Sequence, residues 1–249
     1  MVDADILNLQ HMCAFEMVKD PPSPTSTSTS TSTIPTSSPQ PSCPPATPTP
    51  LTNDFCKLFD ANAWEGYEYW NDISRYYNTT GPGASKGLGP VQGVGYVTEL
   101  LSRLTRNPSY ANKDRTQVDH TLDGSNSTFP LDRRLYADFS HDHQLIAIYG
   151  AMGLFTPSQP LVASDPNSRQ GFIASKMVPF AGRMVVEKMT CLGQAEPLVR
   201  ILVNDAVIQP PNCPNAWGAL CPLSDFVVSQ SYATGKGQTE WLGCQSHNP

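Results

Sequence analysis

Apolar positions return at helical spacing in several stretches of this 249-residue chain. Between Gly93 and Arg106 they recur every three or four residues, which predicts an amphipathic helix. The run 144–154 is almost entirely apolar, so we expect a buried helix there. Tyr67 to Tyr77 is an aromatic-rich helix candidate, and residues 4–18 show a weaker helical period. The region 57–110 is therefore expected to be largely helical.

Strands are expected in the second half of the chain. Leu135, Ala137 and Phe139 alternate with polar neighbours, which favours a strand directly before the apolar helix. Further strands are expected at Met184–Met189 and Leu198–Val203, and the turn Asn204-Asp205 predicts a hairpin into residues 206–208. Interleaved helices and strands indicate an α/β domain. A final helix is expected at 224–232, and loops at 79–90 and 107–130.

One tract cannot take part in a core. Residues 21–50 are Ser, Thr or Pro at 26 of 30 positions, a composition typical of an extended, disordered and O-glycosylated segment. The chain is thus divided into residues 1–20, a tract at 21–50, and a body at 51–249. About 200 residues remain, enough for a sizeable core.

Charge and cysteine usage narrow the class of protein. Acidic residues number 22 against 16 Lys plus Arg, without a basic block, so a nucleic-acid partner is not expected. None of the seven cysteines forms a Cys-x-x-Cys pair, which disfavours zinc and favours disulfides in an oxidising compartment. Sequons at Asn78 and Asn126 also indicate a secreted glycoprotein.

The N-terminus does not match this secreted character. It lacks the cationic start and apolar run of a signal peptide, and no stretch of the chain is apolar enough to span a membrane. The simplest expectation is that Met1 is internal to a longer protein.

The most informative chemistry lies where the predicted strand meets the apolar helix. His141 and Asp142 fall at that turn. A helix start suits phosphate, because its backbone N–H groups are unpaired and its dipole end is positive. Beside a bound phosphate, Asp142 could hold a proton and act as a general acid, with His141 donating a hydrogen bond. The alternative is that Asp142 only caps the helix and His141 is a surface residue.

The sequence Asp138-Phe-Ser-His-Asp142, followed by the apolar helix, closely resembles the His-Asp motif of fungal phytases in the histidine acid phosphatase superfamily. The resemblance covers nearly the whole chain outside residues 21–50, which would be an insertion. It implies that residues 1–20 are the start of a truncated phosphatase domain and residues 51–249 its C-terminal half. Other stretches that resemble the family, in the same order, are Met12-Cys13, Phe55-Cys56, Leu88 to Tyr96, His120 to Asp123, Val178 to Phe180, Glu196 to Arg200, Val203 to Asp205 and the Cys213–Cys221 loop.

The resemblance implies a fold and a reaction. The fold would be the C-terminal part of the histidine acid phosphatase (phosphoglycerate mutase-like) fold, an α/β domain plus a helical region. The reaction would release phosphate from phytate, a small polyanionic ester, through a phosphohistidine intermediate, with Asp142 as proton donor and His141 as phosphate ligand. Neither a metal nor a cofactor is implied, and the full-length protein would be a secreted monomer.

The chain departs from the family at the nucleophile. The family attacks phosphorus with a histidine in an Arg-His-Gly-x-Arg-x-Pro motif, whereas none of the five histidines here follows an arginine. We therefore expect the chain to be inactive alone. Family members also carry substrate-binding basic residues before a Tyr-Tyr pair; Arg75 is the candidate here, and Ser74 cannot serve. The alternative for Arg75 is a solvated arginine on a helix face.

By the same resemblance, Cys13 would pair with Cys56 and Cys213 with Cys221. Cys191 and Cys244 would pair with cysteines outside this chain, and Cys43 has no counterpart in the family. Two other functions stay open: a broad-specificity acid phosphatase, and a non-catalytic secreted glycoprotein that serves as a binding module.

A rival motif is the G-x-S-x-G sequence at Gly83–Gly87. It matches the nucleophile elbow of α/β-hydrolases, but neither the apolar strand nor the helix that the elbow requires flanks it.

Overall fold

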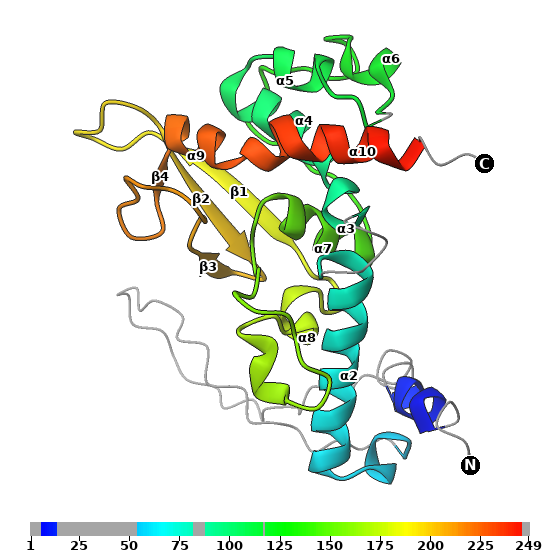
Figure 1. Ribbon diagram of the computed structural model, residues 1–249. Helices are drawn as coiled ribbons and strands as arrows, with labels where there is room; N and C mark the ends of the chain where they lie inside the picture. Colours follow the sequence, from blue (N-terminus) through cyan, green and yellow to red (C-terminus); the bar gives the residue numbers. More distant parts are fainter. Residues whose placement is uncertain (1–5, 14–53, 82–87, 117, 246–249) are drawn as a thin grey trace, which may run out of the picture. The chain divides into compact units, whose positions relative to one another are not determined.

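The computed structural model describes residues 6–13, 54–81, 88–116 and 118–245 (Figure 1). The chain forms two units, residues 1–67 and residues 68–249. The tract at 21–50 with Cys43, and the G-x-S-x-G motif at 83–87, lie outside the described residues. None of the helices in the described ranges combines the length and apolar character needed to cross a membrane.

In the first unit, a disulfide joins two short helical segments. Residues 6–13 are helical, and a 3-10 helix, η1, spans Cys56–Leu58. The bond between Cys13 and Cys56 is formed as the sequence analysis expected, with the two Cα atoms 4.7 Å apart. Gln10 is buried, and its amide donates to the carbonyl of Ala63 in α2 (Ala61–Thr79) over 3.3 Å.

In the second unit, the predicted helices form and bury their apolar faces. Helix α4 (Val94–Thr105) buries every apolar position of its predicted stripe, and α7 (Asp142–Ala151) is buried at Ile146–Tyr149. The two helices pack on each other, and α3 (Leu88–Val91) packs on α7. The core continues into Phe172, Ile201 and Phe226. The predicted loop at 79–90 therefore ends earlier than expected, because its last residues are helical.

The predicted strands belong to a small antiparallel sheet. Strand β1 (Met184–Met189) pairs with β2 (Leu198–Val203), which also pairs with β3 (Ala206–Ile208) and β4 (Cys221–Pro222). The predicted hairpin is confirmed. Asn204 and Asp205 have φ values of 49° and 67°, the left-handed conformations that a tight two-residue hairpin turn requires.

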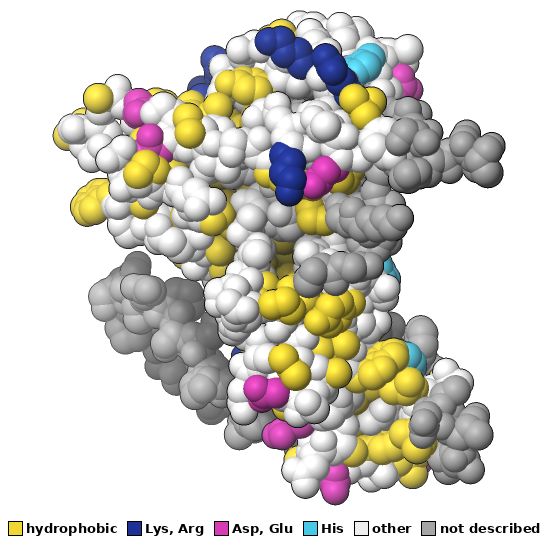
Figure 2. All heavy atoms as spheres, viewed as in Figure 1, with side chains coloured by type: hydrophobic (Ala, Val, Ile, Leu, Met, Phe, Trp, Pro, Cys, Tyr) yellow, Lys and Arg dark blue, Asp and Glu magenta, His cyan; other side chains and the backbone are white. Residues whose placement is uncertain are grey.

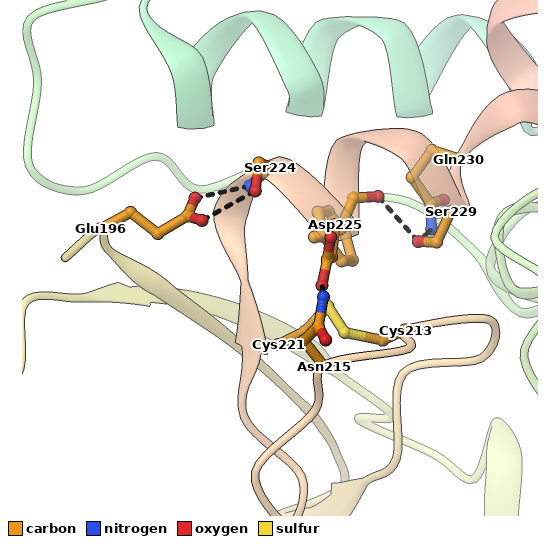
Figure 3. Close-up of a disulfide and its surroundings, with 9 residues drawn as sticks. Glu196, Cys213, Asn215, Cys221, Ser224, Asp225, Ser229 and Gln230 are labelled. Carbon is orange, nitrogen blue, oxygen red and sulfur yellow. Dashed lines mark hydrogen bonds between the residues drawn. A yellow bond between two sulfur atoms is a disulfide. The ribbon is translucent and has the colours of Figure 1, made fainter. Parts of the chain in front are cut away.

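The C-terminal elements follow the sheet. Helix α9 (Leu223–Ser229) begins directly after β4 and leads through a π-helical turn at Tyr232–Lys236 into α10 (Gly237–Gln245). The predicted helix at 224–232 thus ends three residues early, and α10 was not predicted. The expected disulfide Cys213–Cys221 ties the preceding loop to β4, beside hydrogen bonds from Ser224 to Glu196 and from Asn215 to Asp225 (Figure 3).

The strand predicted around Leu135–Phe139 is wrong. These residues have no regular secondary structure, and the side chains of Leu135 and Phe139 are 84% and 99% exposed. A strand exists only when its backbone pairs with a neighbouring strand, and the described residues provide none here. Asp142 consequently begins a helix after an unpaired segment, not at the carboxyl end of a strand.

The segment 107–130, predicted to be a loop, contains two short helices, α5 (Ser109–Asn112) and α6 (His120–Asp123). Buried polar contacts order it. Asp114 accepts hydrogen bonds from Thr98 and from Gln238 of α10, at 2.9 and 2.8 Å. Both ring nitrogens of His120 face acceptors, the Asp123 carboxylate and the Asp114 carbonyl, each at 3.0 Å. The Asp123 hydrogen bond, and then the Asp114 carbonyl, raise the pKa of His120.

The close contact of α4 with α7 requires glycine at position 93. A Cβ atom there would lie 2.4 Å from the carbonyl oxygen of Ala147 and 2.7 Å from the Cα of Ile148, both backbone atoms of α7. We expect Gly93→Ala to lower the free energy of unfolding by about 1–3 kcal/mol or more, since the helices must separate. Urea denaturation of purified protein measures this.

The matched control is Gly66→Ala, where a Cβ would meet nothing within 4 Å inside α2. This change should be neutral or stabilising by up to about 1 kcal/mol, because glycine disfavours helix interiors. Equal destabilisation by both substitutions would contradict the packing argument.

Candidate active site

Helix α7 fixes the position of the His141–Asp142 pair. Asp142 is the first residue of the helix, and His141 is its N-cap, with extended backbone angles of −134° and 169°. The buried residues that follow anchor the helix in the core, so its first turn is held in place. The positive end of the helix dipole favours an anionic ligand at this turn.

The Asp142 carboxylate links α7 to α2. Its Oδ2 atom lies 2.6 Å from an Nη atom of Arg75, and Oδ1 accepts a hydrogen bond from the backbone N–H of His143 over 2.8 Å. The side chains of Arg75 and Asp142 are 23% and 39% exposed. Arg75 is therefore not a solvated arginine on a helix face, and the pair is half-buried yet accessible to a small ligand.

The environment of Asp142 contains opposing influences on its acidity. Burial, the largest, raises the pKa of the carboxyl; the hydrogen bond and charge of Arg75, together with His143, outweigh burial and hold the pKa below its ordinary value. The carboxyl is thus ionised in this arrangement. A role as proton donor requires that Arg75 be drawn away, because burial would then favour the protonated form.

The two neighbouring histidines are exposed. The Nδ1 atom of His141 accepts a hydrogen bond from the backbone N–H of Gln144 over 3.4 Å, so the neutral ring carries its proton on Nε2. That Nε2–H group can donate to an oxygen of a bound anion. His143 Nδ1 lies 3.1 Å from Asp142 Oδ1.

Within the described ranges, His141, Asp142 and His143 form a cluster whose ligand atoms lie within 4.8 Å of one another, close enough for a metal ion. A cation there would meet the Arg75 guanidinium on Asp142 and the positive end of α7. Both repel it, and both attract an anion. The arrangement therefore fits phosphate chemistry better than metal binding, and the absence of a metal requirement stays a prediction.

Arg103 of α4 was missed by the sequence reasoning, yet it holds the segment that leads into the site. Its guanidinium contacts both carboxylate oxygens of Asp138, at 2.5 and 3.2 Å, and lies 5.1 Å from the ring centroids of Phe129 and Tyr136. Asp138 stands three residues before His141, so this contact restrains the approach to α7. Asp138 is the first residue of the Asp138-Phe-Ser-His-Asp142 motif, and this position could have suggested that its carboxylate pairs with a basic side chain.

A hollow of about 350 Å³ lies beside the first turn of α7 and shares Gln144 with the His141 cap. Polar groups that line it include Gln92, Tyr96 and Thr116. Gln144 also donates to the carbonyl of Gln92 over 2.9 Å, which joins the site to the α3–α4 region.

The structure brings Asp142, His141 and Arg75 together, although they come from two separate elements. The glycosylation candidates Asn78 and Asn126 are both exposed. Cys191 is not disulfide-bonded, and the side chain of Cys244 lies outside the description. On the face in Figure 2, apolar side chains are interspersed with polar ones, which is ordinary for a protein surface.

Comparison with known proteins adds independent findings. A sequence model of the histidine phosphatase superfamily (branch 2) matches residues 49–204. Phytase A of Aspergillus terreus is 40% identical over 96% of this chain, and that of Emericella nidulans is 44% identical over 76%. Phytase A of Aspergillus fumigatus is 36% identical over 99% of the chain.

These matches cover only part of each relative. The chain spans 45%, 40% and 46% of the three sequences, less than half of each. The crystal structure of the phytase from D. castellii matches with a TM-score of 0.56 and 21% identity, covering 76% of this chain and 36% of that one. The predicted α/β fold class is confirmed by this likeness together with the family match.

Proposed function

This chain belongs to the histidine phosphatase superfamily (branch 2), and from that membership we propose that it is the proton-donor part of a phytase-type phosphoric monoester hydrolase. The observation that carries the proposal is the half-buried Asp142 at the start of α7, paired with Arg75 and clustered with His141, whose neutral ring has an Nε2–H donor. Such a group offers one anion a positive charge, a hydrogen-bond donor and, once Asp142 is protonated, a proton.

The proposed reaction has two steps. A histidine that this chain does not contain attacks the phosphorus of the ester, and the bond to the leaving oxygen breaks as Asp142 transfers its proton to that oxygen. Water then attacks the phosphohistidine and releases inorganic phosphate. His141 and Arg75 bind the phosphoryl oxygens throughout, where positive charge stabilises the transition state.

The proposed substrate is phytate, and the proposed working pH is acidic. The relatives named Phytase A support the substrate, and an acidic medium supplies the proton that Asp142 must gain. We propose that the whole protein is a secreted monomer without a metal cofactor. The two disulfides and the exposed sequons at Asn78 and Asn126 support secretion.

The test is to join this chain to the part of the Aspergillus terreus relative that it does not cover, and to assay the chimera at acidic pH. We expect release of phosphate from phytate. Asp142→Asn should lower kcat by about 10²–10⁴-fold, the usual contribution of a general acid. Circular dichroism establishes that both chimeras are folded.

The alternatives predict other outcomes. A higher kcat/KM for an aryl phosphate than for phytate would favour a broad-specificity acid phosphatase. A folded chimera without turnover would favour a non-catalytic binding module. An active chimera indifferent to Asp142→Asn would refute the assigned proton donor.

A further inference from the structure

The contact between Arg75 and Asp142 raises a problem for catalysis. A general acid must carry a proton before it can donate one, yet here a guanidinium lies 2.6 Å from the carboxylate and keeps it ionised. The described residues that contact this carboxylate and carry titratable or charged groups are Arg75 of α2 and His143 of α7. Of the two, Arg75 is permanently charged, so it decides the state of Asp142.

The guanidinium of Arg75 has hydrogen-bonding capacity that Asp142 does not use. Its Nη1 atom is buried and donates to no acceptor among the described residues. Leaving such a donor unpaired is unfavourable. A phosphate group presents several oxygens and can accept from more than one N–H of a guanidinium, so it would compete well with a carboxylate held by one nitrogen.

We propose that Arg75, besides binding the phosphate, controls the protonation of Asp142. It holds Asp142 as a carboxylate until a phosphate ester binds at the start of α7, and it then transfers to the phosphate. Asp142, still partly buried and now beside a dianion, takes up one proton from the surrounding water and later gives it to the leaving oxygen. The proposal rests on the proposed function, because it explains how Asp142 becomes an acid only when substrate is present.

The surroundings of Asp142 favour the ionised carboxyl when no substrate is bound and the protonated carboxyl when substrate is bound. Burial is the largest influence on the pKa of Asp142 and acts to raise it; Arg75 is the main opposing influence. When Arg75 leaves, burial remains, and the bound phosphate adds a like charge that acts in the same direction. The protonated donor is thus produced where it is needed, and a donor without substrate stays ionised.

The experiment measures the pKa of Asp142 directly, by carbon NMR of the purified chain with labelled aspartate carboxyls, assigned through Asp142→Asn. In the wild-type chain the pKa should lie below the ordinary aspartate value. In Arg75→Gln it should rise above that value, since only the hydrogen bonds of His143 then oppose burial. Arg75→Lys should lie between the two. The control Arg183→Gln removes an arginine from the exposed ion pair with Asp205 and should leave the Asp142 pKa unchanged.

The second arm adds inorganic phosphate, up to about 100 mM, to each variant. Phosphate should raise the Asp142 pKa in the wild-type chain and have a smaller effect in Arg75→Gln, where no guanidinium is left to transfer. The control of Asp142 by Arg75 is refuted if the Asp142 pKa stays low in Arg75→Gln, or if phosphate leaves the wild-type value unmoved.

The role of Arg75 and the proposed function can fail separately. If the chimera is active and depends on Asp142, but the Asp142 pKa changes neither in Arg75→Gln nor with phosphate, the role of Arg75 is refuted and the proposed function stands. If the Asp142 pKa responds as expected but the chimera has no turnover, Arg75 does move from Asp142 to a bound anion, and the proposed enzymatic function is wrong.

Discussion

Assayed by itself at acidic pH, the purified 249-residue chain should release no phosphate from phytate or from an aryl phosphate above background. The reason lies in the roles of the residues that it contains. Asp142 can protonate a leaving oxygen, and general acid assistance is worth about 10²–10⁴-fold. Uncatalysed hydrolysis of phosphate monoesters is so slow that this gain stays undetectable without a nucleophile and its charge stabilisation. Colorimetric detection of phosphate over several hours measures the rate.

Two controls sharpen the result. Asp142→Asn in the isolated chain should give the same background as the wild-type chain, whereas the same substitution in the chimera should lower a measurable rate. Turnover by the isolated chain that Asp142→Asn abolishes would contradict the prediction, because a nucleophile would then have to lie among these 249 residues.

Arg169→Met should lower the free energy of unfolding by about 3–5 kcal/mol near neutral pH, the usual effect of leaving a buried charge without its partner. An Nη atom of Arg169 lies 2.8 Å from Glu68 and 3.3 Å from Asp72, whose side chain is fully buried. Burial raises the pKa of Asp72 to about 6, although the backbone N–H of Ala174 and the charge of Arg169 act against it. Urea denaturation from pH 4 to pH 8 measures the effect.

The pH dependence of the free energy of unfolding shows whether the Asp72 charge causes the loss of stability in Arg169→Met. Folding raises the pKa of Asp72, so the folded state binds a proton that the unfolded state releases earlier, and stability is lost as pH rises through about 6. Without Arg169 this loss should grow. The substitution should therefore be most harmful above pH 6 and much milder at pH 4, where Asp72 is protonated.

Two matched variants separate this effect from lost packing of Arg169 over the Tyr69 ring. In an Asp72→Asn background, Arg169→Met should have a smaller effect, from the lost Glu68 ion pair and Tyr69 contact, which does not grow as pH rises through about 6. Arg183→Met, which breaks an exposed pair with Asp205, should change stability by less than about 1 kcal/mol. An equal loss at pH 4 and pH 8 in the Arg169→Met chain would show that burial of the Asp72 charge is not the cause.

Local patterns predicted the elements that local patterns determine. The stripe from Val94 to Leu104 needs only a helix and a core to face, and the hairpin at Asn204-Asp205 needs only a turn that tolerates left-handed residues. The segment around Leu135 alternates regularly between apolar and polar residues. A strand forms only where a neighbouring strand is available to pair with, and the alternation does not provide one. A pattern of side chains therefore predicts a strand less securely than a helix.

The ordered segment at 107–130 could not be predicted, because its order comes from distant polar partners. Asp114 is held by Thr98 on one side and by Gln238 of α10 on the other. The candidate site likewise has a part that the sequence predicted and a part that only the structure shows. A resemblance to a known motif identified His141 and Asp142, and periodicity could not have placed Arg75 of α2 against Asp142. The opposing effects of burial and Arg75 on that carboxyl appear only in three dimensions.

The bond between Cys13 and Cys56 has a consequence for how this chain withstands proteases. The two cysteines are 43 residues apart in sequence. A single break at any peptide bond between them leaves the two pieces covalently attached, so a nicked molecule keeps its full mass until the disulfide is reduced. Electrophoresis of a protease-treated sample with and without reductant would separate nicked from intact chains. The first helical segment would thereby stay attached to the rest of the chain even after the backbone between them is cut.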